Sequence, residues 1–120
     1  MSRPSVIAIV DDDEAVREAL FDLLEVEGLA ARTFEGAAAF LDRAGDFDCV
    51  ITDVRMPGID GIELQRRLRG CGSAMPVIYV TSCDDEVARL LALRDGAAGW
   101  FSKPLDDDAL IGRVRAVLAC

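Results

Sequence analysis

Residues 48–58 read DCVITDVRMPG, an apolar run that breaks off at polar residues and a turn. The run from Cys49 to Ile51 is typical of a buried strand, and Pro57 with Gly58 predicts a turn soon afterwards. Asp53 therefore falls at the carboxyl end of an expected central strand, where open α/β sheets bind their ligands. Asp53 could instead cap the next helix, but Asp60 lies nearer to that helix and is the better cap.

Outward from this stretch, strands and helices alternate. We expect strands over 6–10, 30–34, 49–51, 76–80 and 99–101. A helix follows each strand, and the second of these helices is expected to run from Ala37 to Gly45. This alternation predicts a single α/β domain over residues 1–120, with a parallel sheet covered by helices on both faces. Rossmann-type and flavodoxin-type strand orders both remain open from the pattern alone.

The helices are amphipathic, which predicts their inner faces. The first helix presents Val16, Ala19, Leu20, Leu23 and Leu24 on one side, and the third places Arg66, Arg67 and Arg69 outside. Asp84 or Asp85 can cap the fourth helix and Asp106 the fifth.

The composition of the chain excludes several classes of function. The 120 residues carry a net charge of −9, which argues against direct nucleic-acid binding by this chain. The absence of histidine excludes Ser-His-Asp and Cys-His catalysis and histidine-ligated metals. The four cysteines form no C-x-x-C pair, which makes a zinc or redox motif unexpected. There is no signal-peptide pattern and no apolar stretch of the ~20 residues that span a membrane, so we expect a cytoplasmic protein without membrane association.

Two nucleotide-binding interpretations fail at the first strand. Asp11, Asp12 and Asp13 follow it directly, where a dinucleotide fold needs glycines that approach a pyrophosphate. The chain also lacks the glycine-rich loop ending in Lys-Ser or Lys-Thr that marks a P-loop ATPase.

The carboxyl ends of the first, third, fourth and fifth strands should meet at one sheet edge. The residues there are Asp11 and Asp12, Asp53, Thr81 and Ser82, and Lys103. Converging carboxylates repel one another, and oxygen ligands alone select a hard cation: Mg²⁺, with Mn²⁺ or Ca²⁺ as substitutes. A lysine and a hydroxyl beside that cation suit a phosphoryl group, and Asp53 is the natural carboxylate acceptor. Each of these residues alone is weak evidence for a phosphoryl site. Their shared placement at one edge of the sheet is what favours it.

These residues also resemble a known family. The chain is similar to the receiver domain of two-component response regulators, most closely the FixJ type. The matching stretches are residues 9–14, 52–61 and 76–78, Thr81, residues 96–97, and Lys103 with Pro104. The resemblance implies a flavodoxin-like (βα)5 three-layer sandwich with strand order 2-1-3-4-5. It also implies a switch rather than an enzyme, one that assists its own phosphorylation and dephosphorylation.

The resemblance assigns roles at the site. Asp53 would accept a phosphoryl group from a phosphohistidine of a sensor histidine kinase or phosphotransfer protein. Asp12, Asp53 and the backbone carbonyl of Arg55 would bind Mg²⁺ directly, and Asp11 would act mainly through a water. Lys103 would pair with the phosphoryl oxygens.

The resemblance also implies a response to phosphorylation. Thr81 would hydrogen-bond a phosphoryl oxygen and move toward the site, and Trp100 would turn inward. The face formed by the fourth helix, fifth strand and fifth helix would be remodelled and could support a phosphorylation-dependent homodimer. Val87, Leu90 and Leu91 are candidates for this face or for the core beneath it. By analogy, the chain is the receiver part of a transcription regulator whose output domain it controls, with a stand-alone regulator as the alternative.

Two departures from the FixJ pattern affect the expected switching. Residues 81–85 lack the glycines and histidine often found there, so the loop should have less backbone freedom. Trp100 replaces the usual tyrosine or phenylalanine, and a static packing role for it is the alternative. The sequence argues against two other functions. An aspartyl phosphatase would need a second Asp where Arg55 stands, and a module that binds partners without phosphorylation would have no reason to keep the carboxylates together.

Overall fold

A five-stranded parallel sheet forms the middle layer of the computed structural model, which describes residues 4–82 and 84–119. Its strands are β1 (Val6–Val10), β2 (Ala30–Phe34), β3 (Cys49–Thr52), β4 (Val77–Thr81) and β5 (Gly99–Ser102). Their order is β2-β1-β3-β4-β5, and every neighbouring pair is parallel. The flavodoxin-type order is therefore confirmed, and the Rossmann-type order is excluded.

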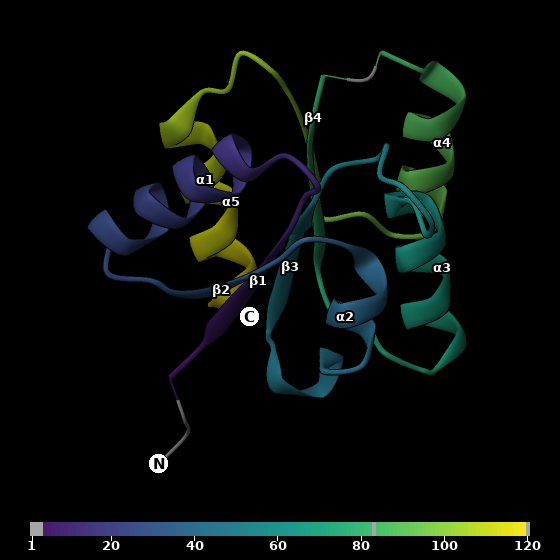
Figure 1. Ribbon diagram of the computed structural model, residues 1–120, viewed down its shortest axis with the longest axis horizontal. Helices are drawn as coiled ribbons and strands as arrows, with labels where there is room; N and C mark the ends of the chain where they lie inside the picture. The colour runs from purple at the N-terminus through teal and green to yellow at the C-terminus, as the bar shows by residue number, and fades with distance from the viewer. Residues whose placement is uncertain (1–3, 83, 120) are drawn as a thin grey trace.

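Helices cover both faces of the sheet. They are α1 (Glu14–Val26), α2 (Ala37–Leu41), α3 (Gly61–Gly70), α4 (Glu86–Arg94) and α5 (Asp107–Leu118). In Figure 1, α1 and α5 lie on one side of the strands, and α2, α3 and α4 lie on the other. The three expected layers are thus present.

The second helix is shorter than its sequence predicts. The expected continuation to Gly45 is wrong, because α2 ends at Leu41 and a separate 3-10 turn spans Ala44–Asp46. Glycine disfavours a helix interior by about 1 kcal/mol relative to alanine, and short 3-10 turns are common connectors. The turn still brings Phe47 inward, where its ring packs edge-on against Phe34.

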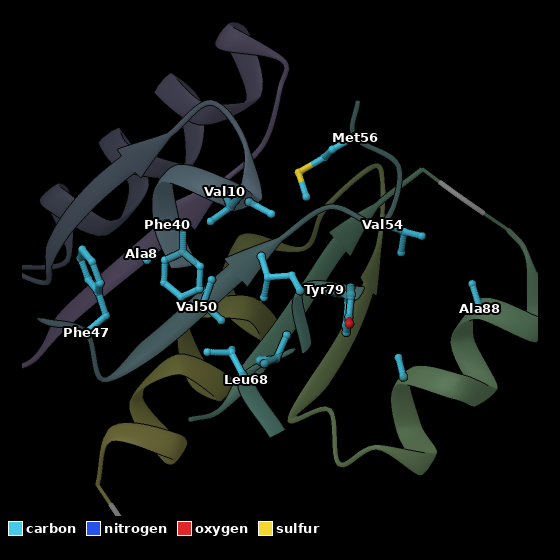
Figure 2. Close-up of a cluster of buried hydrophobic side chains, with 14 residues drawn as sticks. Ala8, Val10, Phe40, Phe47, Val50, Val54, Met56, Leu68, Tyr79 and Ala88 are labelled. Atoms are coloured by element: carbon cyan, nitrogen blue, oxygen red, sulfur yellow. The ribbon is translucent and has the colours of Figure 1, made fainter. Parts of the chain in front are cut away.

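Alternating side chains divide the core into two clusters. Ala8 and Val10 of β1 point toward α2, α3 and α4, whereas Ile7 and Ile9 point toward α1 and α5. Figure 2 shows the first cluster, in which Tyr79 lies among apolar side chains from several elements. Burial on both faces explains why β1, β3 and β4 read as continuous apolar runs.

The structure shows which side chains of α1 and α4 are buried. Ala19 was expected on the inner face of α1 but is exposed, while Leu20 and Leu24 are buried there. On α4 the buried side chains are the small Ala88 and Ala92. Val87 and Leu90 are 66% and 55% exposed, so they belong to the surface of this helix rather than to the core.

Aspartates cap the helices that follow the site-bearing strands. Asp60 caps α3, Asp85 caps α4 and Asp106 caps α5, each by accepting hydrogen bonds from first-turn amides, as predicted. Asp13 caps α1 in the same way, accepting from the amides of Ala15 and Val16. These carboxylates satisfy helix amides that would otherwise lack partners.

Candidate functional site

The strand order brings the predicted site residues to one edge of the sheet. Val10 of β1 is paired with Thr52 of β3, so the residues that follow them, Asp11 and Asp53, lie side by side. The amide of Asp53 also donates to the carbonyl of Val10 at 3.3 Å. Thr81 ends β4, and Lys103 follows β5, whose Ser102 is paired with Thr81.

The carboxylate of Asp53 is held in a defined orientation. Its Oδ1 accepts a hydrogen bond of 2.6 Å from the backbone amide of Val54. Its Oδ2 lies 3.9 Å from the Nζ of Lys103, and only 14% of the Asp53 side chain is exposed. One carboxylate oxygen is therefore held by a backbone amide, and the other faces the ammonium group of Lys103.

Asp11 is the most deeply buried acid of this edge, with 2% exposure. Its Oδ1 accepts a hydrogen bond of 2.9 Å from the amide of Asp13. Burial raises the pKa of Asp11, the charges of Asp53 and Asp12 raise it further, and the Asp13 amide and Lys103 oppose the shift. The site thus carries more negative charge than its own groups compensate.

This charge excess fits a divalent cation. A bound cation offsets the repulsion between carboxylates, and the donor set of Asp11, Asp12 and Asp53 contains only oxygen. Within residues 4–82 and 84–119, no group of three acidic or cysteine side chains is arranged so that it could hold a metal ion. Mg²⁺ does not require such a group, since it commonly uses one or two carboxylates and keeps several waters.

The other expected site residues lie at different depths. Thr81 is buried, with 1% exposure, and Trp100 is partly buried with its ring centroid 5.3 Å from that of Tyr79. The side chain of Arg55 is exposed, and its guanidinium lies 3.6 Å from Oδ2 of Asp85. Cys83, in the loop where a change of backbone freedom was expected, lies outside the described residues.

Sequence reasoning missed a buried polar group under the site. The hydroxyl of Tyr79 lies 2.9 Å from the carbonyl oxygen of Gly61 and 2.6 Å from Oε1 of Gln65. Gln65 itself is 1% exposed. The available signal was a glutamine beside Leu64 on the apolar side of α3, together with a tyrosine inside a buried strand.

The expectation that Arg69 lies outside is wrong. Its Nε donates to the carbonyl of Asp95, and its Nη1 donates to the carbonyls of Ser73 and Met75, all within 3.1 Å. The side chain therefore ties the end of α3 to the end of α4 and to the loop before β4.

An apolar groove opens beside Lys103. It has a volume of about 420 Å³ and lies between α1 and the segment after β5. Ala15, Ala19, Leu20 and Leu105 contribute to its lining. The exposed position of Ala19 is thus part of a concave surface next to the site.

Comparison with known proteins identifies relatives over nearly the whole chain. Residues 7–115 match the family described as the response regulator receiver domain. The transcriptional regulatory protein FixJ of Azorhizobium caulinodans is 47% identical over 114 residues, which are 93% of this chain and 54% of that protein. The response regulator protein TmoT of Ectopseudomonas mendocina is 40% identical over 116 residues, which are 95% of this chain and 53% of that protein. The chain spans about half the length of these curated relatives.

Solved structures agree with this assignment. The crystal structure of FixJ-N superposes with a TM-score of 0.88 at 32% identity and covers 97% of this chain and 94% of that one. The response regulator StyR superposes with a TM-score of 0.89 at 34% identity, covering 98% of this chain and 60% of that one. None of the helices in the described part of the chain combines the length and apolar composition that a membrane crossing needs.

Proposed function

The chain belongs to the response regulator receiver domain family, and on this premise we propose that it is a phosphorylation-activated switch whose acceptor is Asp53. Receiver domains are signalling switches rather than classical enzymes, and the relatives include transcriptional regulators. The observation that carries the proposal is the oriented Asp53 carboxylate, with Oδ1 on the Val54 amide and Oδ2 facing Lys103.

The proposed reaction is phosphoryl transfer to a carboxylate. An oxygen of Asp53 attacks the phosphorus of a phosphohistidine, the P–N bond breaks as the P–O bond forms, and the imidazole leaves with a proton taken from solvent. Lys103 stabilises the negative charge on the transferred oxygens. Thr81 donates a hydrogen bond to one of them and moves toward the site. The donor histidine lies outside residues 1–120, which contain none, and we infer that it belongs to a sensor histidine kinase or phosphotransfer protein.

The same residues account for a metal requirement. Asp12, Asp53 and the backbone carbonyl of Arg55 would hold Mg²⁺ directly, and Asp11 would act mainly through a water. When bound, the ion neutralises the clustered carboxylates and the phosphoryl oxygens. Mn²⁺ or Ca²⁺, which also accept oxygen ligands, can take its place.

Two surfaces near the site support the proposed partners. The groove beside Lys103 offers apolar contacts to a helix of the phosphodonor, close to the acceptor. Val87 and Leu90 of α4 are exposed. They lie on the face that inward movement of Trp100 would change on phosphorylation. Through this face two phosphorylated copies would form a homodimer. We place this receiver domain, residues 1–120, in a cytoplasmic transcription regulator whose output it controls without binding nucleic acid or membrane itself.

Intact mass spectrometry tests the acceptor. The protein is incubated with acetyl phosphate, with and without Mg²⁺, beside Asp53→Asn and the control Asp106→Asn, which alters a helix cap. We expect one added phosphoryl group in the wild type and in Asp106→Asn, dependent on Mg²⁺ and absent from Asp53→Asn. An adduct that persists in Asp53→Asn would contradict the assignment. A folded wild type modified by neither acetyl phosphate nor a phosphohistidine donor would favour a module that binds partners without phosphorylation.

A further inference from the structure

A chain of buried hydrogen bonds runs from the loop after β3 to the end of α4. Its centre is Tyr79 of β4, the largest of the fully buried side chains. Its hydroxyl has one proton and lies within hydrogen-bond distance of two acceptors, Gly61 O at 2.9 Å and Gln65 Oε1 at 2.6 Å. Burial raises the pKa of Tyr79, so this hydroxyl remains a donor at neutral pH.

At one end this series of hydrogen bonds supports Asp53, the proposed phosphoacceptor. The amide of Gly61 donates to the carbonyl of Val54 at 2.8 Å, and the amide of Val54 in turn donates to Oδ1 of Asp53. A β-carbon at Gly61 would overlap the carbonyl oxygen of Asp53 and press on the Tyr79 ring. The position of Gly61 therefore helps to set the peptide that orients the Asp53 carboxylate.

At its other end the series of hydrogen bonds holds the last turn of α4. The Nε2 of Gln65 donates to the carbonyls of Ala92 and Asp95, at 3.3 and 3.0 Å. These carbonyls lie at a helix end, where backbone acceptors lack partners within the helix. The partners also fix the amide orientation of Gln65, because two carbonyls can only accept and the tyrosine hydroxyl must donate.

Tyr79 also contacts the expected switch residue. Its ring and that of Trp100 have centroids 5.3 Å apart and are inclined at 36°. One side chain thus contacts α3 at Gly61 and Gln65, the residues that lead to the acceptor loop and to the end of α4, and it also contacts the aromatic of β5.

We propose that Tyr79 and Gln65 are positioning residues that tie the Asp53 loop to the last turn of α4, so that acceptor reactivity and α4 position depend on each other. The kinetic part of this inference rests on the proposed function, while the mechanical link does not. Coupling of this kind is reciprocal, because a state of α4 favoured by phosphorylation also favours phosphorylation. A partner that covers α4 would then change the phosphorylation equilibrium at Asp53.

The first test uses hydrogen exchange in the absence of any phosphodonor. Tyr79→Phe removes only the hydroxyl and keeps the ring against Trp100. Tyr79 reaches α4 through Gln65, so faster exchange of amides 92–97 would report the link rather than a direct contact. Val114→Ala, in the core cluster beneath α1 and α5, serves as a control for general loss of stability. We expect about tenfold faster exchange over 92–97 in Tyr79→Phe than in Val114→Ala, compared after correction for the measured stability of each.

The second test measures the reaction with acetyl phosphate and Mg²⁺. We expect Tyr79→Phe to slow phosphorylation of Asp53 three- to tenfold and to reduce the accompanying change in emission of Trp100, the only tryptophan in the chain. Val114→Ala should retain both. The double variant Tyr79→Phe/Gln65→Leu should be no slower than the slower single variant, because both changes break the same connection.

The outcomes separate the two proposals. Unchanged exchange at 92–97 in Tyr79→Phe overturns the link, and wild-type phosphorylation kinetics in that variant overturn the positioning role. A wild type that takes up no phosphoryl group contradicts the proposed function instead. The exchange rates alone then decide whether Tyr79 ties the two segments together.

Discussion

No side chain fits between the α-carbon of Gly61 and the carbonyl oxygen of Asp53, because a β-carbon built on Gly61 would overlap that oxygen. Gly61→Ala must therefore displace the acceptor loop or the Tyr79 ring, and we expect it to lower the free energy of unfolding by about 2 kcal/mol. Gly70→Ala at the other end of α3 is the control, since nothing lies within 4 Å of its added methyl. Urea unfolding of both variants checks this, and equal stabilities would contradict the close approach.

Lys103 should matter far more to phosphorylation than to stability. Its Nζ lies 3.9 Å from Asp53 Oδ2, and a partly exposed ion pair contributes at most about 1 kcal/mol. Lys103→Met removes a charge from the phosphoryl site, and we expect the rate of phosphorylation by acetyl phosphate to fall about a hundredfold. Lys103→Arg, which keeps the charge, is the matched control and should lose less. A Lys103→Met protein that reacts at the wild-type rate would remove this residue from the mechanism.

The buried Asp11 predicts a pH dependence of stability. Because burial raises its pKa in the folded state, its contribution to stability is fully present below the unfolded pKa of 3.8 and is lost as pH rises through the folded pKa. Charged Asp11 therefore destabilises the metal-free protein at neutral pH. Asp11→Asn should raise the free energy of unfolding at pH 7 by about 1 kcal/mol, and this gain should shrink toward pH 4.

Urea unfolding between pH 4 and pH 7 without divalent ions measures this effect. The exposed Asp22→Asn on α1 is the control and should show no such gain. Mg²⁺ should then stabilise the wild type more than Asp11→Asn, because the ion offsets the charge that the variant lacks. If the free energies of unfolding of the wild type and Asp11→Asn differ by the same amount at every pH, the pKa of Asp11 is not raised by folding.

Two neighbouring arginines should differ sharply in their effect on stability. Arg69 donates to three backbone carbonyls, and hydrogen bonds from charged donors are among the stronger ones. We expect Arg69→Ala to lower the free energy of unfolding by about 2 kcal/mol. Arg67 forms an exposed ion pair with Glu63, so Arg67→Ala should cost less than about 0.5 kcal/mol. Thermal or urea unfolding of the two variants makes the comparison, and equal losses would contradict the bracing role of Arg69.

Local signals predicted the sheet and which residues lie at the edge that carries the candidate site. Every strand except β2 ends where an apolar run meets polar residues, and Asp60, Asp85 and Asp106 cap the helices expected of them. These features depend on neighbours in sequence, so a single sequence contains them. The choice of strand order came from family resemblance, because the pattern alone allowed two orders.

Features that depend on distant segments were not predictable in the same way. The roles of Gln65 and Arg69 arise from carbonyls at Ala92 and Asp95, which lie on another helix or just after it. The side of α4 that is buried could not be read from hydropathy, because the sheet accepts Ala88 and Ala92 and leaves the larger Val87 and Leu90 outside. Tertiary fit, rather than hydrophobicity, selects the inner face there.

The small buried side chains of α4 also affect how its motion would be detected. The buried residues of this helix are two alanines, so α4 itself would transfer little apolar area into water if it detached locally. The heat-capacity change and the denaturant m-value both scale with newly exposed area. A movement of α4 that leaves the core beneath it covered should therefore have only a small calorimetric signature.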